Sequence, residues 1–237
     1  MDRREFFTKT RKRSRAFYRT MATGLNPYAG AWTSNEVAHL LKRTLFGAKK
    51  ADIDHFLAMS PAAAVDELLT NIPLPGTPLR DYGLIQDEFG IWHDDLGVQQ
   101  GQTWVNDLNT LSDPEVRSSI NRLRTASLYK WWAGVIVNQN RSITEKMILF
   151  WHHHFSVQQE EVGNSTMLWR HHKIFRDDPL GSVKQLVRDV TIDPAMLFHL
   201  NGYLNSKLAP DENYAREMQE LFTVGRGPDS LYTENDV

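Results

Sequence analysis

Apolar side chains recur at helical spacing along most of this chain, and no other feature of the sequence constrains the fold as strongly. Between residues 113 and 138, for example, Ile120, Leu123, Leu128 and Trp131 follow one another at intervals that place them on one side of a helix. No segment alternates apolar and polar residues convincingly enough for a strand. The sequence therefore predicts an all-α fold, an irregular multi-helix bundle of about eight to ten helices.

Capping residues and glycines divide this pattern into separate helices. Thr33 with Glu36 is a capping signal, and Gly47 is the matching stop. Asp113, Thr144 and Asp193 are expected to cap later helices. Helices are expected over residues 34–46, 51–59, 61–69, 114–138, 144–155, 167–175, 182–190, 194–200 and 211–225, of which the first three form a compact N-terminal unit.

Residues 71–111 are expected to be a long, loop-rich connector, because prolines and glycine interrupt its start and its aromatic residues are mixed with carboxylates. Two readings of these aromatics are open. They pack the connector onto its own domain, or they bind the faces of sugars. The aromatic residues concerned are Tyr82, Phe89, Trp92 and Trp104.

Charge is distributed unevenly along the 237 residues. The chain has a net charge of −2, but residues 1–19 hold eight basic and two acidic residues, so this segment is +6 and the remainder is −8. Residues 1–30 are therefore predicted to be a basic, disordered arm, and residues 31–237 to be the helical domain. The arm suits phosphates, a membrane surface or an export receptor, while its few aromatics argue against nucleic-acid binding.

Several classes of protein are disfavoured by what the sequence lacks. Without cysteine there is neither a disulfide scaffold nor thiolate chemistry. No apolar run approaches the roughly 20 residues of a membrane span, so no transmembrane segment is expected. The pair Arg3-Arg4 is similar to the start of a twin-arginine export signal, but basic residues follow it where such a signal is apolar.

The first stretch that carries candidate functional residues is residues 144–155, Thr-Glu-Lys-Met-Ile-Leu-Phe-Trp-His-His-His-Phe. Glu145 and His152 share one face of this helix, whereas His152 and His154 lie about 200° apart and cannot ligate one ion. Buried ionisable groups need partners. The histidines are therefore structural, or act as an acid–base group, or belong to a metal site completed by other segments. Ligands for such a site would come from His171, His172, His199, Glu217 or Glu220; the expectation is no metal and no cofactor.

The second stretch is residues 211–222. Four polar residues share one stripe of this predicted helix: Asn213, Arg216, Glu217 and Glu220. The stripe is either a solvated face or the wall of a cleft. In a cleft, Glu217 or Glu220 would act as a base or ligand and Arg216 would orient an anion.

Four stretches together, residues 38–47, 144–155, 213–225 and 232–237, resemble the bacterial DUF1800 family. Members of this family are much longer and often exported, and they neighbour sulfatase-like DUF1501 proteins. The resemblance implies a C-terminally truncated member, in agreement with the helix-start signal at Thr233 and Asp236. The recurrent polar positions of the family match Glu145, His152, His154, Asn213, Arg216 and Glu217. No activity is established for the family, so no residue role follows from the resemblance.

Two functional hypotheses follow. The first is an envelope-associated or exported hydrolase acting on a glycan or ester polymer, located in the periplasm or cell envelope in preference to the cytoplasm. In it, His152 and Glu217 form the acid–base pair. Glu145, His154 and Arg216 complete the catalytic set, and Asn213 and Glu220 bind substrate. The alternative is a non-enzymatic helical scaffold or partner-binding protein. In it, a buried hydrogen-bond network of Glu145, His152, Arg216 and Glu217 fixes helix register. Expected partners are a DUF1501-type protein or a cell-envelope polymer.

Overall fold

A computed structural model describes residues 26–70, 72–210 and 212–225, together with residues 230, 232, 233 and 236. The chain divides into two compact units, residues 1–31 and residues 32–237. Most of the predicted basic arm, residues 1–25, lies outside the described residues, and residues 26–31 form neither helix nor strand. All the elements that follow belong to the second unit.

The described residues form ten α-helices, one short 3₁₀ helix and a single two-stranded sheet. The predicted all-α class, with eight to ten helices, is thereby confirmed. No helix in the described part of the chain is both long enough and apolar enough to cross a membrane.

The first three helices are α1 (Ser34–Thr44), α2 (Lys50–Leu57) and α3 (Pro61–Thr70). The predicted capping box opens α1: the Thr33 hydroxyl accepts from the N–H of Asn35, and the Thr33 N–H donates to Glu36. These helices enclose a core of their own, as expected. Its buried side chains are Val37, Leu41, Leu45, Phe56, Ala64 and Leu68.

Residues 72–111 contain a small antiparallel hairpin of β1 (Ile85–Gln86) and β2 (Trp92–His93), and then lead into α4 (Pro114–Val137). Trp104 is fully buried, and its indole N–H donates to the hydroxyl of Ser127 on α4 at 2.8 Å. Tyr82 is buried in the same core, whereas Phe89 and Trp92 are exposed. Only part of the connector is therefore packed onto its own domain by its aromatic residues.

Arg124 of α4 holds the connector in place. Its guanidinium is completely buried and donates two hydrogen bonds to the carboxylate of Asp95, at 2.8 and 2.6 Å, and one to that of Asp107 at 2.7 Å. The Tyr82 hydroxyl donates to Asp95 at 2.6 Å. Burial, followed by this bond to Asp95, raises the pKa of Tyr82 well above its usual value. The loop-rich segment is consequently fixed by charge-assisted hydrogen bonds.

The remaining helices are α5 (Thr144–His154), α6 (Gln159–Val162), α7 (Ser165–Asp177), α8 (Val183–Thr191), α9 (Pro194–His199), the 3₁₀ helix η1 (Gly202–Leu204) and α10 (Glu212–Glu220). Side chains of Asn164, Ser182 and Asp193 cap α7, α8 and α9. Thr144 was expected to cap α5; it is instead the first helical residue, and its N–H donates to Ser142.

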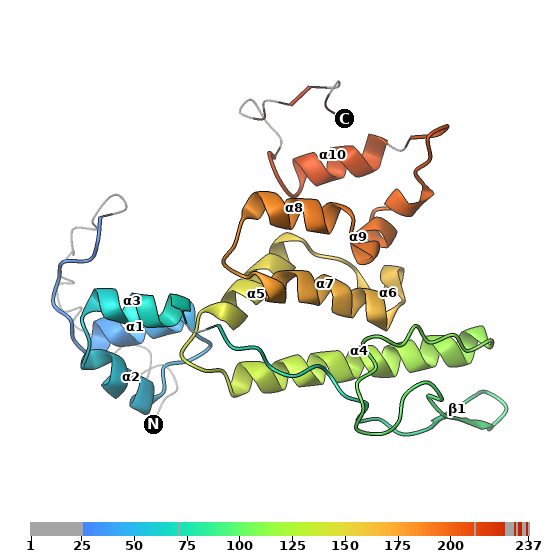
Figure 1. The fold of residues 1–237 in the computed structure, drawn as a ribbon, viewed down its shortest axis with the longest axis horizontal. Helices are drawn as coiled ribbons and strands as arrows, with labels where there is room; N and C mark the ends of the chain where they lie inside the picture. The colour runs from blue at the N-terminus through green and yellow to red at the C-terminus, as the bar shows by residue number, and fades with distance from the viewer. Residues whose placement is uncertain are drawn as a thin grey trace, which may run out of the picture. The chain divides into compact units, whose positions relative to one another are not determined.

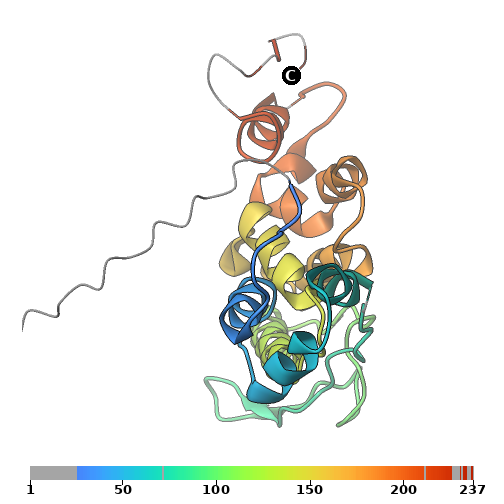
Figure 2. The same cartoon turned by 90° about the vertical axis from the view of Figure 1, so that its left-hand side faces the viewer.

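Helix α7 is central to the packing, because it contacts α4, α5, α8 and α9. Figure 1 and Figure 2 show it between α4 on one side and α8 on the other. A second large core lies among α5 and α7–α10. Its buried side chains are Ile148, Phe155, Phe175, Leu186, Val190, Met196, Tyr214, Met218 and Phe222. The two chemically distinctive stretches thus meet at this core.

Candidate functional site

Glu145 lies in the first turn of α5 and is only 1% exposed. Arg176 of α7 donates two parallel hydrogen bonds to it, both of 2.8 Å. The indole N–H of Trp132 on α4 donates to the same carboxylate at 2.9 Å. A buried carboxylate is costly unless it is paired and hydrogen-bonded, and these three donors meet that requirement. The ion pair therefore joins α5 to α7, and the indole hydrogen bond adds α4.

The hydrogen bonds continue from Arg176 to two histidines. Its Nε–H donates to Nε2 of His172 at 3.2 Å, so that nitrogen carries no proton. The proton of His172 is then on Nδ1, which lies 2.9 Å from Nε2 of His152 and donates to it. Nε2 of His152 is therefore an acceptor, and its proton is on Nδ1. Because arginine only donates, it fixes the direction of the whole chain of bonds.

Burial also keeps both of these histidines neutral. Burial, with smaller effects from the neighbouring His171 and Arg176, lowers the pKa of His152 to about 3. Burial, with smaller effects from His152 and Arg176, puts the pKa of His172 well below its usual value. With its Nε2 lone pair occupied and so low a pKa, His152 is a weak base at neutral pH.

Aromatic rings surround this network. The guanidinium of Arg176 lies over Trp131, 5.1 Å from the ring centroid. The Trp132 ring lies 4.7 Å from that of His172 and 4.9 Å from that of His152, measured between centroids. Such contacts stabilise a cation and neutral imidazoles in a water-poor environment. We refer to Trp132, Glu145, His152, His172 and Arg176 as the buried polar network; Glu145, His172 and Arg176 are buried, and Trp132 and His152 are half-buried.

A third histidine has separate partners. Nδ1 of His171 lies 2.9 Å from the Asp193 carboxylate, and Nε2 lies 2.9 Å from the carbonyl oxygen of Phe155. This arrangement ties α7 to the cap of α9 and to the end of α5. Within the described residues, no three or more histidine, aspartate or glutamate side chains are grouped so that they could hold a metal ion.

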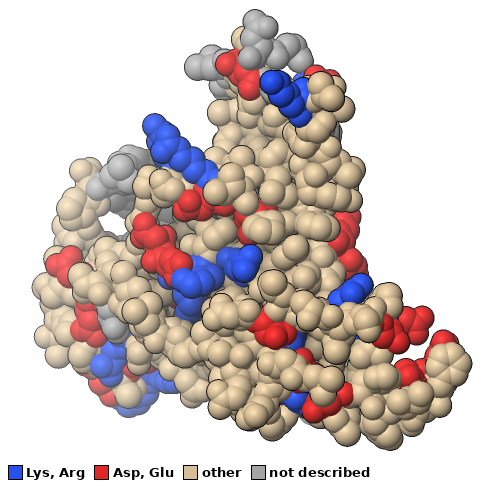
Figure 3. Space-filling view, turned by 45° about the vertical axis from the view of Figure 1, so that its right-hand side comes forward, with Lys and Arg blue, Asp and Glu red and all other residues tan. Residues whose placement is uncertain are grey.

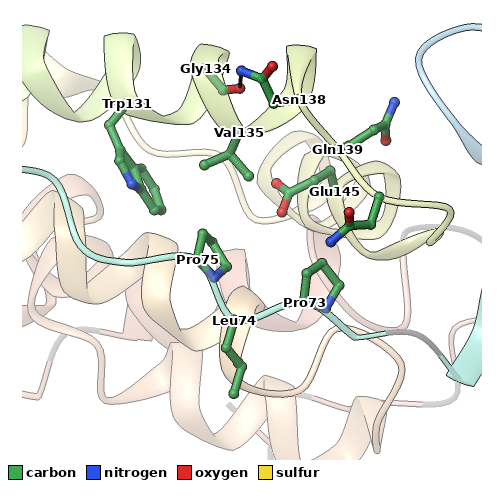
Figure 4. A pocket seen from close by; sticks show the side chains of 10 residues that line it. Pro73, Leu74, Pro75, Trp131, Gly134, Val135, Asn138, Gln139 and Glu145 are labelled. Carbon is green, nitrogen blue, oxygen red and sulfur yellow. Dashed lines mark hydrogen bonds between the residues drawn. The ribbon is translucent and has the colours of Figure 1, made fainter.

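A pocket of about 600 Å³ borders the buried polar network. Figure 4 shows Trp131 and Val135 of α4 facing Pro73 and Pro75 of the extended segment, with Glu145 at one end. Most of its walls are apolar, and the charge of Glu145 is already neutralised by Arg176. The volume is typical of small-molecule pockets, and the lining suits an uncharged, largely apolar group.

His154 points to a different neighbour. It lies on the last turn of α5, is exposed, and its Nε2 lies 2.8 Å from the carbonyl oxygen of Phe222, just after α10. Helix α10 packs on the second core through Tyr214, Met218 and the following Phe222. Burial raises the pKa of Tyr214 to about 12, and its hydroxyl donates to the carbonyl of Thr191. The apolar face of α10, rather than its polar stripe, meets the core.

The polar stripe of α10 is placed towards the outside. Asn213 is exposed, and Arg216, Glu217 and Glu220 are half-buried. The hydroxyl of Tyr232 donates to Glu220. The structure therefore brings Glu145 and His152 into one network, which bonds to α4 and α7. The role of the α10 stripe stays a prediction.

Sequence reasoning missed two members of the buried polar network, Trp132 and Arg176. A signal was available, because His172 and Arg176 are four residues apart and so share one face of a helix. His171 and His172 were considered only as ligands of a metal. Their observed partners are a carboxylate, a carbonyl oxygen, an arginine and another histidine.

Comparisons with known proteins agree with the resemblance seen in the sequence. No curated protein and no solved structure matches the chain. A family model described as "Protein of unknown function (DUF1800)" matches residues 39–237, a range that begins within α1 and includes α4, α5, α7 and α10. Because this match extends over most of the sequence, the chain belongs to the DUF1800 family.

Proposed function

We propose that the protein is a non-enzymatic, partner-binding scaffold in which the buried polar network holds α4, α5 and α7 in register. The observation that carries this proposal is that the polar atoms of the network are hydrogen-bonded to one another. Glu145 accepts three hydrogen bonds, and both ring nitrogens of His172 are bonded within the network. A group committed in this way serves the fold rather than a substrate.

The properties of His152 also favour a scaffold over a hydrolase. A general base works best when its pKa is near the working pH and its lone pair can reach the substrate. The pKa of His152 is about 3, and its Nε2 accepts from His172. The expected association with a DUF1501-type protein or a cell-envelope polymer stays a prediction, as does location in the cell envelope.

A double-mutant cycle tests the structural role. Glu145→Leu or Arg176→Met alone leaves an unpaired buried charge, and each is expected to lower the free energy of unfolding by about 3–5 kcal/mol. The double variant removes both charges and should lose much less than the sum of the two. Urea denaturation followed by circular dichroism measures all four proteins. Lys50 and Asp54, an exposed pair on α2, provide the control cycle, with coupling expected below about 0.5 kcal/mol.

The same proteins distinguish the scaffold from the hydrolase. We expect no turnover of p-nitrophenyl esters or p-nitrophenyl glycosides above that of a buffer blank. Turnover that His152→Gln abolishes without lowering the melting temperature would overturn the proposal. Purely additive losses in the Glu145 and Arg176 cycle would also contradict it.

A further inference from the structure

The β1–β2 hairpin exposes an unusual amount of apolar surface. Phe89 is 79% exposed, Trp92 61% and Ile91 57%, and the flanking residues Leu84 and Leu96 are 54% and 78% exposed. Single exposed apolar residues are common, but a group of five within thirteen consecutive residues indicates a binding surface. We refer to these five residues as the hairpin surface.

The turn that presents these residues is ordered by one side chain. Asp87 accepts hydrogen bonds from the N–H groups of Phe89 and Ile91, at 3.0 and 2.8 Å, and its second oxygen lies 2.7 Å from Nε2 of His93. The bond to His93, followed by those to the two N–H groups, lowers the pKa of Asp87, so the carboxylate stays charged.

Gly90 completes the turn with φ of 79°, a conformation that favours glycine. Its carbonyl accepts from the side chain of Gln86 at 2.9 Å. The apolar side chains are thus held outward by a defined turn. A surface ordered in this way loses little entropy on binding, which favours affinity.

The charge carried by the hairpin segment itself is mainly acidic, although His93 pairs with Asp87 and Arg122 of α4 lines the neighbouring cavity. Residues 81–96 contain five carboxylates and neither lysine nor arginine. Three of the five pair with basic side chains elsewhere: Asp81 with Lys130, Asp94 with Arg80 and Asp95 with Arg124. Asp87 lies against His93, and the exposed Glu88 contributes negative charge at the tip. Figure 3 shows acidic side chains gathered at the lower right, where the hairpin projects.

This charge decides which occupant the surface fits. Two copies of the hairpin placed against each other would bring like charges together, and an anionic membrane surface would repel the tip. A basic segment with apolar side chains would satisfy both the charge and the apolar area. A cavity of about 360 Å³ between the hairpin and the start of α4 offers room for an anchoring side chain.

We propose that the hairpin surface binds a basic peptide segment of a partner protein, with Phe89 and Trp92 as the main apolar contacts and Glu88 as the charge that selects the partner. The proposal rests on the proposed partner-binding function and names the partner's chemistry. It depends on a surface that is distinct from the buried polar network.

Binding of fluorescently labelled peptides to the full chain tests this inference. The probes are three short peptides of equal length, with alternating lysine and leucine, alternating glutamate and leucine, or alternating lysine and serine. The lysine–leucine peptide is expected to bind most tightly, and its affinity to fall when salt is raised from about 0.1 to about 1 M, since the Debye length shrinks from about 10 to about 3 Å.

Variants then identify the surface. Phe89→Ser and Trp92→Ser should each weaken the lysine–leucine peptide by roughly tenfold or more, the loss typical of a central contact. Leu208→Ser, at a residue that is 96% exposed and lies outside the hairpin, is the matched control and should leave the affinity unchanged. Glu88→Lys should weaken the lysine–leucine peptide and strengthen the glutamate–leucine peptide.

Several outcomes would overturn the inference. They are equal affinity for all three peptides, equal losses in Phe89→Ser and Leu208→Ser, self-association that Phe89→Ser abolishes, or binding to vesicles of phosphatidylcholine and phosphatidylglycerol that Trp92→Ser abolishes. Each would leave the double-mutant cycle of Glu145 and Arg176 unaffected. Failure of this inference is therefore distinguishable from failure of the scaffold proposal.

Discussion

Two tryptophans show how much the charge of an acceptor matters at the scale of a single residue. The indole N–H of Trp132 donates to the charged Glu145 at 2.9 Å, and that of Trp151 donates to the neutral carbonyl of Pro179 at 3.0 Å. Hydrogen bonds to charged groups contribute about 1.5–3 kcal/mol, against about 0.5–1.5 kcal/mol for neutral ones. Trp132→Phe is therefore expected to lower the free energy of unfolding by more than Trp151→Phe does.

Urea denaturation of the two phenylalanine variants measures this difference directly. Both substitutions shorten the ring system by a similar volume, so the packing losses largely cancel in the comparison. Equal losses would show that the Trp132 N–H contributes nothing beyond packing. A larger loss for Trp151→Phe would contradict the assignment of Glu145 as an ionised acceptor.

At the residue scale, the sequence indicates which groups need partners but not who the partners are. Glu145 on an apolar helix was expected to require compensation, and the structure supplies it. Helical geometry assigns a residue to a face of its own helix. It says nothing of the helix packed against that face, so Arg176, thirty-one positions further along the chain, could not be identified as the partner. Arg216 was the candidate of the scaffold hypothesis.

At the scale of elements, Arg124 of α4 determines whether the connector is ordered. Its guanidinium is buried and bonded to Asp95 and Asp107. Arg124→Met leaves both carboxylates without this cation, at a cost of about 3–5 kcal/mol. We expect faster amide hydrogen exchange across residues 94–109 in this variant, measured by mass spectrometry.

The control for this experiment is Arg122→Met on the same helix. Arg122 is exposed and its hydrogen bond is to Ser119 of its own helix, so its loss should leave exchange in the connector unchanged. Exchange that increases equally in both variants, or in neither, would contradict the role of Arg124 in ordering the connector.

Elements with strong local signals were predicted well, and short ones were not. Caps at Thr33, Asp113 and Asp193 mark helix starts in the sequence and in the structure alike, because a side chain satisfies the exposed N–H groups. The four-residue α6 and the two-residue strands were missed, since so few residues carry no periodicity. Helix α10 ends at Glu220, before Gly225, and turns fill the interval.

For the whole molecule, the buried histidines predict loss of stability in acid. The pKa of His152 is about 3 when folded and about 6.5 when unfolded. Below pH 6.5, His152 therefore binds a proton in the unfolded chain but not in the folded chain. The stability is fully present above pH 6.5 and falls as the pH is lowered towards 3, by about 1.4 kcal/mol per pH unit for this histidine. His172, whose pKa is also lowered, acts in the same direction.

Free energies of unfolding measured in urea from pH 7.5 down to pH 4.5 test this dependence. His152→Gln should make the free energy of unfolding fall less steeply with decreasing pH, because it removes one of the two histidines that bind a proton only in the unfolded chain. His39→Gln changes an exposed histidine of α1 and should leave the slope as it is. A slope that is identical in all three proteins would contradict the assignment of His152 as neutral in the folded state.

The joint between the first three helices and the rest of the second unit has a consequence for cooperativity. The N–H of Ile143 donates to the carbonyl of Leu68 at 3.0 Å, two residues before Glu145, and Arg141 pairs with Asp52 nearby at 2.9 Å. Helices α1–α3 otherwise enclose their own core. Their opening would thus remove the backbone bond that anchors the first turn of α5. Local unfolding of the core of α1–α3 is therefore expected to weaken the ion pair of Glu145 and Arg176, because Glu145 lies in that first turn of α5.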